Sequence, residues 1–81
     1  MSVPVIRYFA AARAAAGRSE ETLPASTLAD LVALVSAQHG DRMASVLAAS
    51  SFLVDGLAAH DRSAPLADRS TVDVLPPFAG G

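Results

Sequence analysis

One strong helical pattern lies in the middle of the chain, between segments with the composition of strands. Its apolar residues recur at i, i+3, i+4 and i+7: Leu28, Leu31, Val32 and Val35. Ala29 and Leu34 are expected to widen this apolar stripe. Thr27 and Asp30 resemble an N-terminal capping box, and Gly40 ends the pattern. One main helix is too few for a doubly wound parallel sheet, so the sequence predicts an α+β fold in one domain.

Strand-like runs flank this helix on both sides, at residues 3–9, 18–23, 52–54 and 71–75. The alanine-rich residues 10–16 predict a short helix that Gly17 ends, and residues 41–49 predict a second helical piece after the main one. Asp55 and Gly56 form a tight-turn dipeptide. This order predicts a mixed β-sheet with one main helix packed on one face.

Alternation along the first and last strands predicts which side chains face the helix. The predicted inner face carries four side chains: Ile6, Tyr8, Val72 and Val74. Phe9 and Leu75 then lie on the outer face, flanked by Arg7 and Asp73. If the two strands are neighbours, Phe9 and Leu75 form one exposed apolar patch, which would mark an interface. Alternatively, a loop covers this face, or the exposed apolar residues have no special role.

The C-terminal segment does not have the composition of a packed domain. Its six residues are Pro76, Pro77, Phe78, Ala79, Gly80 and Gly81. Proline fixes its own φ and favours an extended residue before it, which predicts a stiff stem. Glycine loses more conformational freedom on ordering than any other residue, so a plain disordered end is one interpretation. The other is a flexible tail whose carboxylate enters another protein's active site.

Composition argues against several functional classes. The net charge is −2 and none of the six basic residues is lysine, whereas a nucleic-acid-binding domain needs a clustered basic face. The chain has no cysteine, which removes disulfides and thiolate metal sites. It has no apolar run of membrane-spanning length and no signal-peptide pattern at its start, so we expect a cytoplasmic protein that binds neither nucleic acid nor membrane.

Isolated polar residues predict no catalytic site. Glu20 and Glu21 are adjacent, so on a strand they point to opposite sides and cannot act as a carboxylate pair. His39 lies at the end of the predicted helix, without a second metal ligand at suitable spacing. Ser50 and Ser51 have no histidine or acid placed by a motif. We therefore expect no metal, no cofactor bound by this chain and no independent enzyme.

Three segments together resemble the MoaD family, the small subunits of molybdopterin synthase. They are Arg7–Arg13, Leu53–Gly56 and Val74–Gly81. The resemblance extends over nearly the whole chain, and the sequence Pro-Pro-x-x-Gly-Gly after a terminal strand is its most specific part. It implies a ubiquitin-like β-grasp domain over residues 1–75, with the last strand parallel to and beside the first. Residues 76–81 would then form an extended tail.

The same resemblance implies a sulfur carrier. A MoeB-like adenylating enzyme would activate the Gly81 carboxylate with ATP, and a sulfur donor protein would convert it to a thiocarboxylate. The carrier would then bind a MoaE-like large subunit in a heterotetramer and give sulfur for the dithiolene of molybdopterin. Residues 76–80 would thread into the active site, while Phe9, Arg13 and Leu75 would contact the partner. A solvated Arg13 without a partner is an equal alternative.

Two other functions fit the same residues. A related carrier could deliver sulfur to another pathway, such as thiamine or cysteine synthesis. A ubiquitin-like modifier would instead join its Gly81 carboxylate to lysines of other proteins, with no sulfur involved.

Overall fold

The computed structural model describes residues 2–77, which form helices and strands in the predicted order. The elements are β1 (Val5–Tyr8), α1 (Ala10–Ala16), β2 (Glu20–Thr22), α2 (Leu28–His39), α3 (Asp41–Ala49), β3 (Ser51–Val54), β4 (Leu57–Ala58) and β5 (Thr71–Leu75). The bounds of α1, α3 and β5 are those expected from the sequence. The strands at residues 3–9 and 18–23 are shorter than expected, because only their central residues pair with a neighbour.

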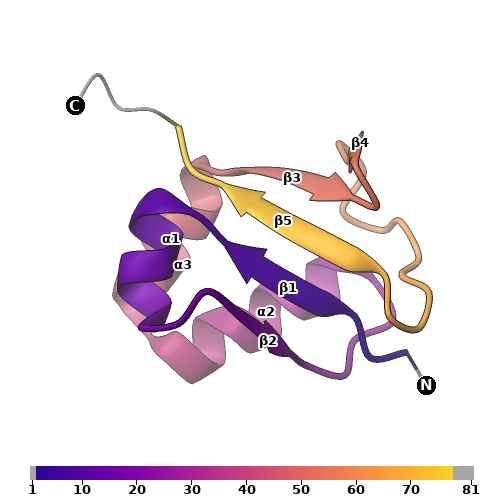
Figure 1. The fold of residues 1–81 in the computed structure, drawn as a ribbon, viewed down its shortest axis with the longest axis horizontal. Coiled ribbons are helices and arrows are strands. Elements are labelled where there is room, and N and C mark those ends of the chain that lie inside the picture. Colours follow the sequence, from indigo (N-terminus) through magenta and orange to yellow (C-terminus); the bar gives the residue numbers. More distant parts are fainter. Residues whose placement is uncertain (1, 78–81) are drawn as a thin grey trace.

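The five strands form one mixed sheet in the order β2-β1-β5-β3-β4 (Figure 1). β1 and β5 lie side by side at its centre and are parallel, with Ile6 opposite Val72 and Tyr8 opposite Val74. The other neighbouring pairs are antiparallel. This is the ubiquitin-like β-grasp arrangement, so the predicted fold is confirmed.

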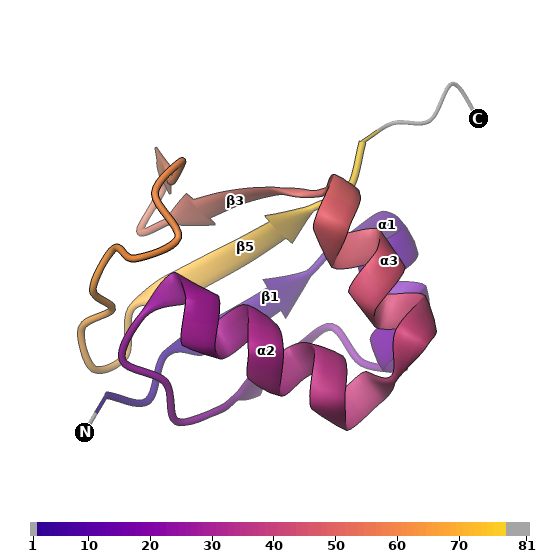
Figure 2. The ribbon, with the colours of Figure 1, turned by 180° about the vertical axis from the view of Figure 1, so that it is seen from behind.

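Helices α2 and α3 cover one face of the sheet (Figure 2). The backbone N–H of Asp30 donates to Thr27 Oγ1 at 3.2 Å, so the predicted cap of α2 is present. Gly17 ends α1 at φ 73°, a left-handed conformation in which glycine avoids the penalty of a Cβ atom. The opposite face of the sheet is turned toward the viewer in Figure 1. No helix within the described residues covers that face.

The hydrophobic core lies between the sheet and the helices. It contains the four side chains predicted for the inner face, together with Ala12, Ala25, Leu28, Leu31, Val35, Met43, Leu47, Phe52 and Leu66. The expected widening of the α2 stripe is wrong, since Leu34 is 38% exposed and Ala29 is exposed as well. At roughly 100° per residue, Leu34 lies about 60° and Ala29 about 100° around the helix from the nearest buried residue of α2. The sheet therefore buries only a narrow stripe.

Candidate functional site

The candidate site lies where β1 and β5 end side by side on the face without helices. Leu75 is the last residue of β5 and is partly buried beside Ser51 of β3. Pro76 is partly buried and Pro77 is exposed. The predicted reacting residue Gly81 lies outside the described residues, as do the other predicted threading residues Phe78, Ala79 and Gly80. Their assigned roles stay predictions.

Phe9 follows β1 directly and is 40% exposed, as the alternation along the strand predicts. Its backbone is still extended, with φ −127° and ψ 150°. Ala10 then adopts φ 50°, a left-handed value that is uncommon for a residue with a side chain. The chain therefore leaves the sheet sharply after Phe9 and begins α1. Since Tyr8 lies opposite Val74, Phe9 follows β1 at the level where Leu75 ends β5.

Arg7 and Asp73 form a two-point ion pair across the central strands. Arg7 Nε donates to Asp73 Oδ1 at 2.6 Å and Arg7 Nη2 donates to Oδ2 at 2.9 Å. The Arg7 side chain is 47% exposed, whereas that of Asp73 is 9% exposed because the guanidinium covers it. These hydrogen bonds raise the pKa of Arg7 above its ordinary value. Asp73, expected as an open flank of the patch, is instead buried on the outer face beneath Arg7.

The Arg7 guanidinium also lies beside the apolar residue of the site. Its central carbon is 6.0 Å from the centre of the Phe9 ring. Arg13 is exposed on α1, four residues after Phe9, and no ion pair to it forms within residues 2–77. Its expected contact with an acidic partner residue stays a prediction. Of these two arginines, Arg7 therefore lies beside the Phe9 ring in space, and Arg13 is near it in the sequence.

A second polar cluster lies on the helix side of β1 and was not foreseen from the sequence. Glu21 on β2 accepts hydrogen bonds from Tyr8 Oη at 2.6 Å and from Gln38 Nε2 at 2.7 Å. His39 Nε2 lies 2.6 Å from Glu21 Oε2, and Arg18 Nη1 lies 3.7 Å from Oε1. The parity of Glu20 and Glu21 is as predicted, but the partners of Glu21 are up to 18 residues away in the chain. Only the fold brings them together.

Burial and hydrogen bonding act in opposite directions on Glu21. Its side chain is 4% exposed, and burial alone would raise its pKa. The hydrogen bonds from Tyr8, His39 and Gln38, together with the charge of His39, outweigh burial and hold the pKa of Glu21 below its ordinary value. Burial and the hydrogen bond to Glu21 raise the pKa of Tyr8. The cluster therefore contains a buried carboxylate and joins β1, β2 and the end of α2.

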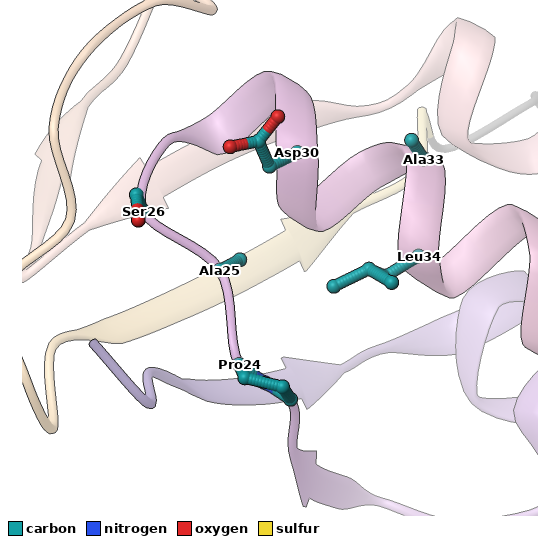
Figure 3. Close-up of a pocket in the computed structure, with 6 residues that line it drawn as sticks. All are labelled: Pro24, Ala25, Ser26, Asp30, Ala33 and Leu34. Atoms are coloured by element: carbon teal, nitrogen blue, oxygen red, sulfur yellow. The ribbon is translucent and has the colours of Figure 1, made fainter. Parts of the chain in front are cut away.

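A groove of about 500 Å³ lies on the helix side, between residues 24–26 and α2 (Figure 3). Leu34, Ala33 and Asp30 line its α2 wall. None of the residues predicted to bind a partner lies in it. The groove explains how Leu34 stays exposed, and it offers no group of side chains suited to catalysis.

The described part of the chain contains no group of three or more histidine, aspartate or glutamate residues that could hold a metal ion. No helix within residues 2–77 is both long and apolar enough to cross a membrane.

Comparisons with known structures agree on the fold. A solution structure of small archaeal modifier protein 1 from Methanosarcina acetivorans matches with a TM-score of 0.86 and 20% identity, over 100% of this chain and 98% of that one. Molybdopterin converting factor subunit 1 of Pyrococcus furiosus matches with a TM-score of 0.85 and 22% identity, over 96% and 100%. Subunit 1 of the same factor from Helicobacter pylori, in complex with subunit 2, gives 0.74 and 20%, over 98% and 99%.

No curated protein sequence matches this chain closely enough to count as a relative. The model of the ThiS family, in contrast, matches residues 6–81, which include both central strands and the C-terminal segment. By this match and by its ubiquitin-like β-grasp fold, the chain belongs to the ThiS family of ubiquitin-like proteins.

Proposed function

We propose that this chain is the sulfur-carrying small subunit of a molybdopterin synthase. The observation that best supports this is the place of β5, which lies at the centre of the sheet and leads directly into Pro76, Pro77 and the terminal glycines. The family match includes this terminal segment. The folded domain positions β5 beside β1, and the C-terminal residue Gly81 is the group that reacts.

The chemistry needs two transfers at the Gly81 carboxyl group. A terminal carboxylate has an ordinary pKa of about 3.3–3.7 and is ionised at neutral pH, so it can attack the α-phosphorus of ATP and displace pyrophosphate. Hydrosulfide released by a donor protein then attacks the acyl carbon, and AMP leaves. The product is a thiocarboxylate whose sulfur passes to a pterin precursor of the dithiolene. Glycines at both final positions leave no Cβ atom to clash in a narrow channel.

Three partner proteins are required for this reaction sequence. An adenylating enzyme uses ATP, a sulfur donor supplies the sulfur, and a MoaE-like large subunit receives the loaded tail in a heterotetramer. The Helicobacter pylori structure supports the last of these, because there a protein of the same fold is in complex with subunit 2 of molybdopterin-converting factor. Phe9, Arg13 and Leu75 contact these partners, and the reaction takes place in the cytoplasm.

Intact-mass spectrometry tests the proposal. The chain is incubated with its cognate adenylating enzyme, ATP and sulfide, and we expect the mass increase of one oxygen replaced by sulfur. A variant that lacks Gly81 should show no increase, while its thermal unfolding stays that of the wild type. An unchanged mass for the wild type under conditions in which the enzyme is active would contradict the proposal.

Two other functions would give different results in this experiment or in an assay of dithiolene formation. The matching family model is that of ThiS, which favours a carrier for thiamine synthesis as second candidate. Such a carrier would gain sulfur but would not support dithiolene formation with a molybdopterin synthase large subunit. The likeness to an archaeal modifier protein favours conjugation instead. A modifier would appear as adducts on lysines of other proteins, without gain of sulfur.

A further inference from the structure

The edge strand β2 presents backbone groups that no other strand uses. Among the described residues, β1 is its only neighbour in the sheet. The backbone N–H of Tyr8 donates to the carbonyl oxygen of Ser19 at 2.8 Å, and hydrogen-bonded pairs alternate along antiparallel strands. The backbone N–H and C=O groups of Glu20 and Thr22 therefore face away from β1. Both residues are exposed, and nothing in the described part of the chain forms a backbone hydrogen bond with these outward groups.

The groove of Figure 3 continues along this edge. Its α2 wall contains Asp30 and Leu34, and residues 24–26 form the opposite wall. A second hollow, of about 520 Å³, is lined in part by residues 20–23 and by Gln38. Asp30, Leu34 and Gln38 follow one another at four-residue spacing, so they share one face of α2. The groove and the second hollow therefore lie one after the other between the β2 edge and this face of α2.

One charge dominates the groove. Asp30 is the only charged residue that lines it, and Leu34 and Pro24 are exposed apolar residues beside it. The Asp30 side chain is exposed, and its carboxylate has no ion pair or hydrogen bond within the described residues. In the second hollow, Arg18 and Glu21 balance each other at 3.7 Å. A ligand complementary to the groove therefore combines an apolar side chain with a neighbouring basic one.

We propose that the β2 edge and the groove bind an extended segment of another protein as an added strand. The backbone of that segment pairs with the outward groups of Glu20 and Thr22, as in other cases of strand addition. Because side chains alternate along a strand, every second side chain of the segment enters the groove. An apolar side chain packs there against Leu34, and a basic one pairs with Asp30.

A second copy of this chain is a poorer occupant of the edge. Its own edge strands are β2, with the sequence Glu-Glu-Thr, and β4, with the sequence Leu-Ala. Neither contains a basic residue to pair with Asp30. Pairing of β2 with β2 would also bring glutamates of the two copies together, and like charges directly opposite each other destabilise a sheet. The charge of the groove thus favours a partner of different sequence.

The proposed site lies away from the tail. Thr22 is opposite Val5, at the start of β1, whereas the tail strand β5 places Val74 opposite Tyr8, at the end of β1. A bound segment therefore leaves the C-terminus accessible, and the chain can hold a second protein while its tail reacts. The inference goes beyond the proposed function and does not depend on it.

NMR titration of the full ¹⁵N-labelled chain tests the inference. The probe is the synthetic peptide acetyl-Arg-Thr-Val-Thr-Val-Thr-Arg-amide, in which valines and arginines share one face and a terminal arginine can reach Asp30 in either strand direction. We expect saturable shifts at residues 20–25 and at Asp30, Leu34 and Gln38, with a Kd of about 1 mM or below. The amide protons of Glu20 and Thr22 should exchange more slowly with solvent when the peptide is bound.

Two pairs of variants test the backbone and the charge separately. Thr22→Pro removes an outward N–H that β1 does not use, and should weaken peptide binding at least about tenfold. Thr22→Val keeps this N–H and should bind like the wild type. Asp30→Asn should weaken binding about fivefold, as expected for an exposed ion pair. Asp41→Asn is the matched control, since Asp41 also lies exposed in the first turn of a helix, and it should have no effect.

Modified peptides test the same points without any change in the protein. A peptide with glutamate in place of both arginines, or with N-methylated central residues, should not bind the wild type. These peptides decide if Thr22→Pro does not fold. The inference is overturned if several millimolar of the probe causes no shifts, if the shifts lie at Phe9 and Leu75 instead, or if the modified peptides bind equally well. A dimer formed through the β2 edge that excludes the peptide would overturn it as well.

Discussion

Arg7 and Tyr8 are consecutive residues of β1, and each donates hydrogen bonds to a carboxylate on a neighbouring strand. Because strand side chains alternate, Arg7 points to the face without helices and Tyr8 points into the core. Arg7 binds Asp73 where half of its own side chain stays in water. Tyr8 binds Glu21 in a cluster that His39 and Gln38 complete.

Because the two contacts differ in solvent exposure, their loss should affect the stability of the fold differently. In the buried cluster, removal of one member leaves the others without partners in a place that water reaches poorly, which costs folding free energy. On the open face, water replaces a lost partner, and exposed ion pairs add little stability. We therefore infer that the Glu21 cluster contributes more to the stability of the fold than the Arg7–Asp73 pair does.

The largest expected effect on stability is that of Glu21→Ala. It removes the acceptor of buried Tyr8, partly buried His39 and exposed Gln38, and should lower the free energy of unfolding by about 2–4 kcal/mol. Glu20→Ala removes the exposed neighbour on the same strand and should change it by less than about 0.5 kcal/mol. Denaturant unfolding measures both. Equal losses in the two variants would contradict the assignment of the two faces.

Acid should destabilise the protein through Glu21. Its pKa is lower in the folded than in the unfolded chain, so the unfolded chain binds more protons at acid pH. The stabilisation is complete above the unfolded pKa of about 4.3 and is lost as pH falls through the lower folded value. Unfolding at pH 7 and at stepwise lower pH should show this loss. Glu21→Gln should have a flatter pH profile; a profile as steep as that of the wild type would assign the loss to other carboxyl groups.

Tyr8→Phe should have a smaller effect, because the ring keeps its place in the core and only the hydroxyl is lost. We expect the free energy of unfolding to fall by about 1 kcal/mol, the usual net value of one hydrogen bond. In a double-mutant cycle with Glu21→Gln the two losses should not add, since the groups are in contact. Additive losses would show that the hydroxyl and the carboxylate act independently.

The smallest effect on stability, and the sharpest contrast between the faces, is expected from two exposed apolar residues. Phe9 and Leu34 have nearly equal exposed fractions, but Phe9 lies beside the tail strand and Leu34 lies on the helix side. Replacement of either by alanine should lower stability by at most about 1 kcal/mol. Only Phe9→Ala should raise the KM of the carrier in adenylation. A protein that unfolds on this substitution would show that Phe9 is a core residue.

Local patterns predicted most of the fold because they depend on neighbouring residues. The Thr27 cap and the glycines that end α1 and α2 are local signals, and the alternation of β1 and β5 identified their inner faces correctly. The exposure of Leu34 was not predictable in this way, because it depends on how much of α2 the sheet covers. Family resemblance, rather than pattern, supplied the parallel pairing of β1 with β5.

At the candidate site, too, local patterns predicted some features, and contacts between distant residues determined the others. The exposure of Phe9 follows from strand parity, and Arg7 was expected beside it. The burial of Asp73 and the Glu21 cluster depend on contacts between residues far apart in the sequence, at a separation of 66 for Arg7 and Asp73. Charged residues of this kind look like ordinary surface residues in a sequence, since nothing local marks which of them will meet a partner.

The parallel pairing of β1 with β5 has a consequence for biosynthesis. Contacts between distant parts of a chain form late in folding, because the intervening loop must first be closed. While the ribosome still holds the last strand, β1 lacks β5 as its neighbour, Arg7 has no Asp73, and Phe9 and Leu75 do not yet lie at the same end of the sheet. Under the proposed function, a partner that contacts both strands would accept only molecules whose first and last strands have already paired.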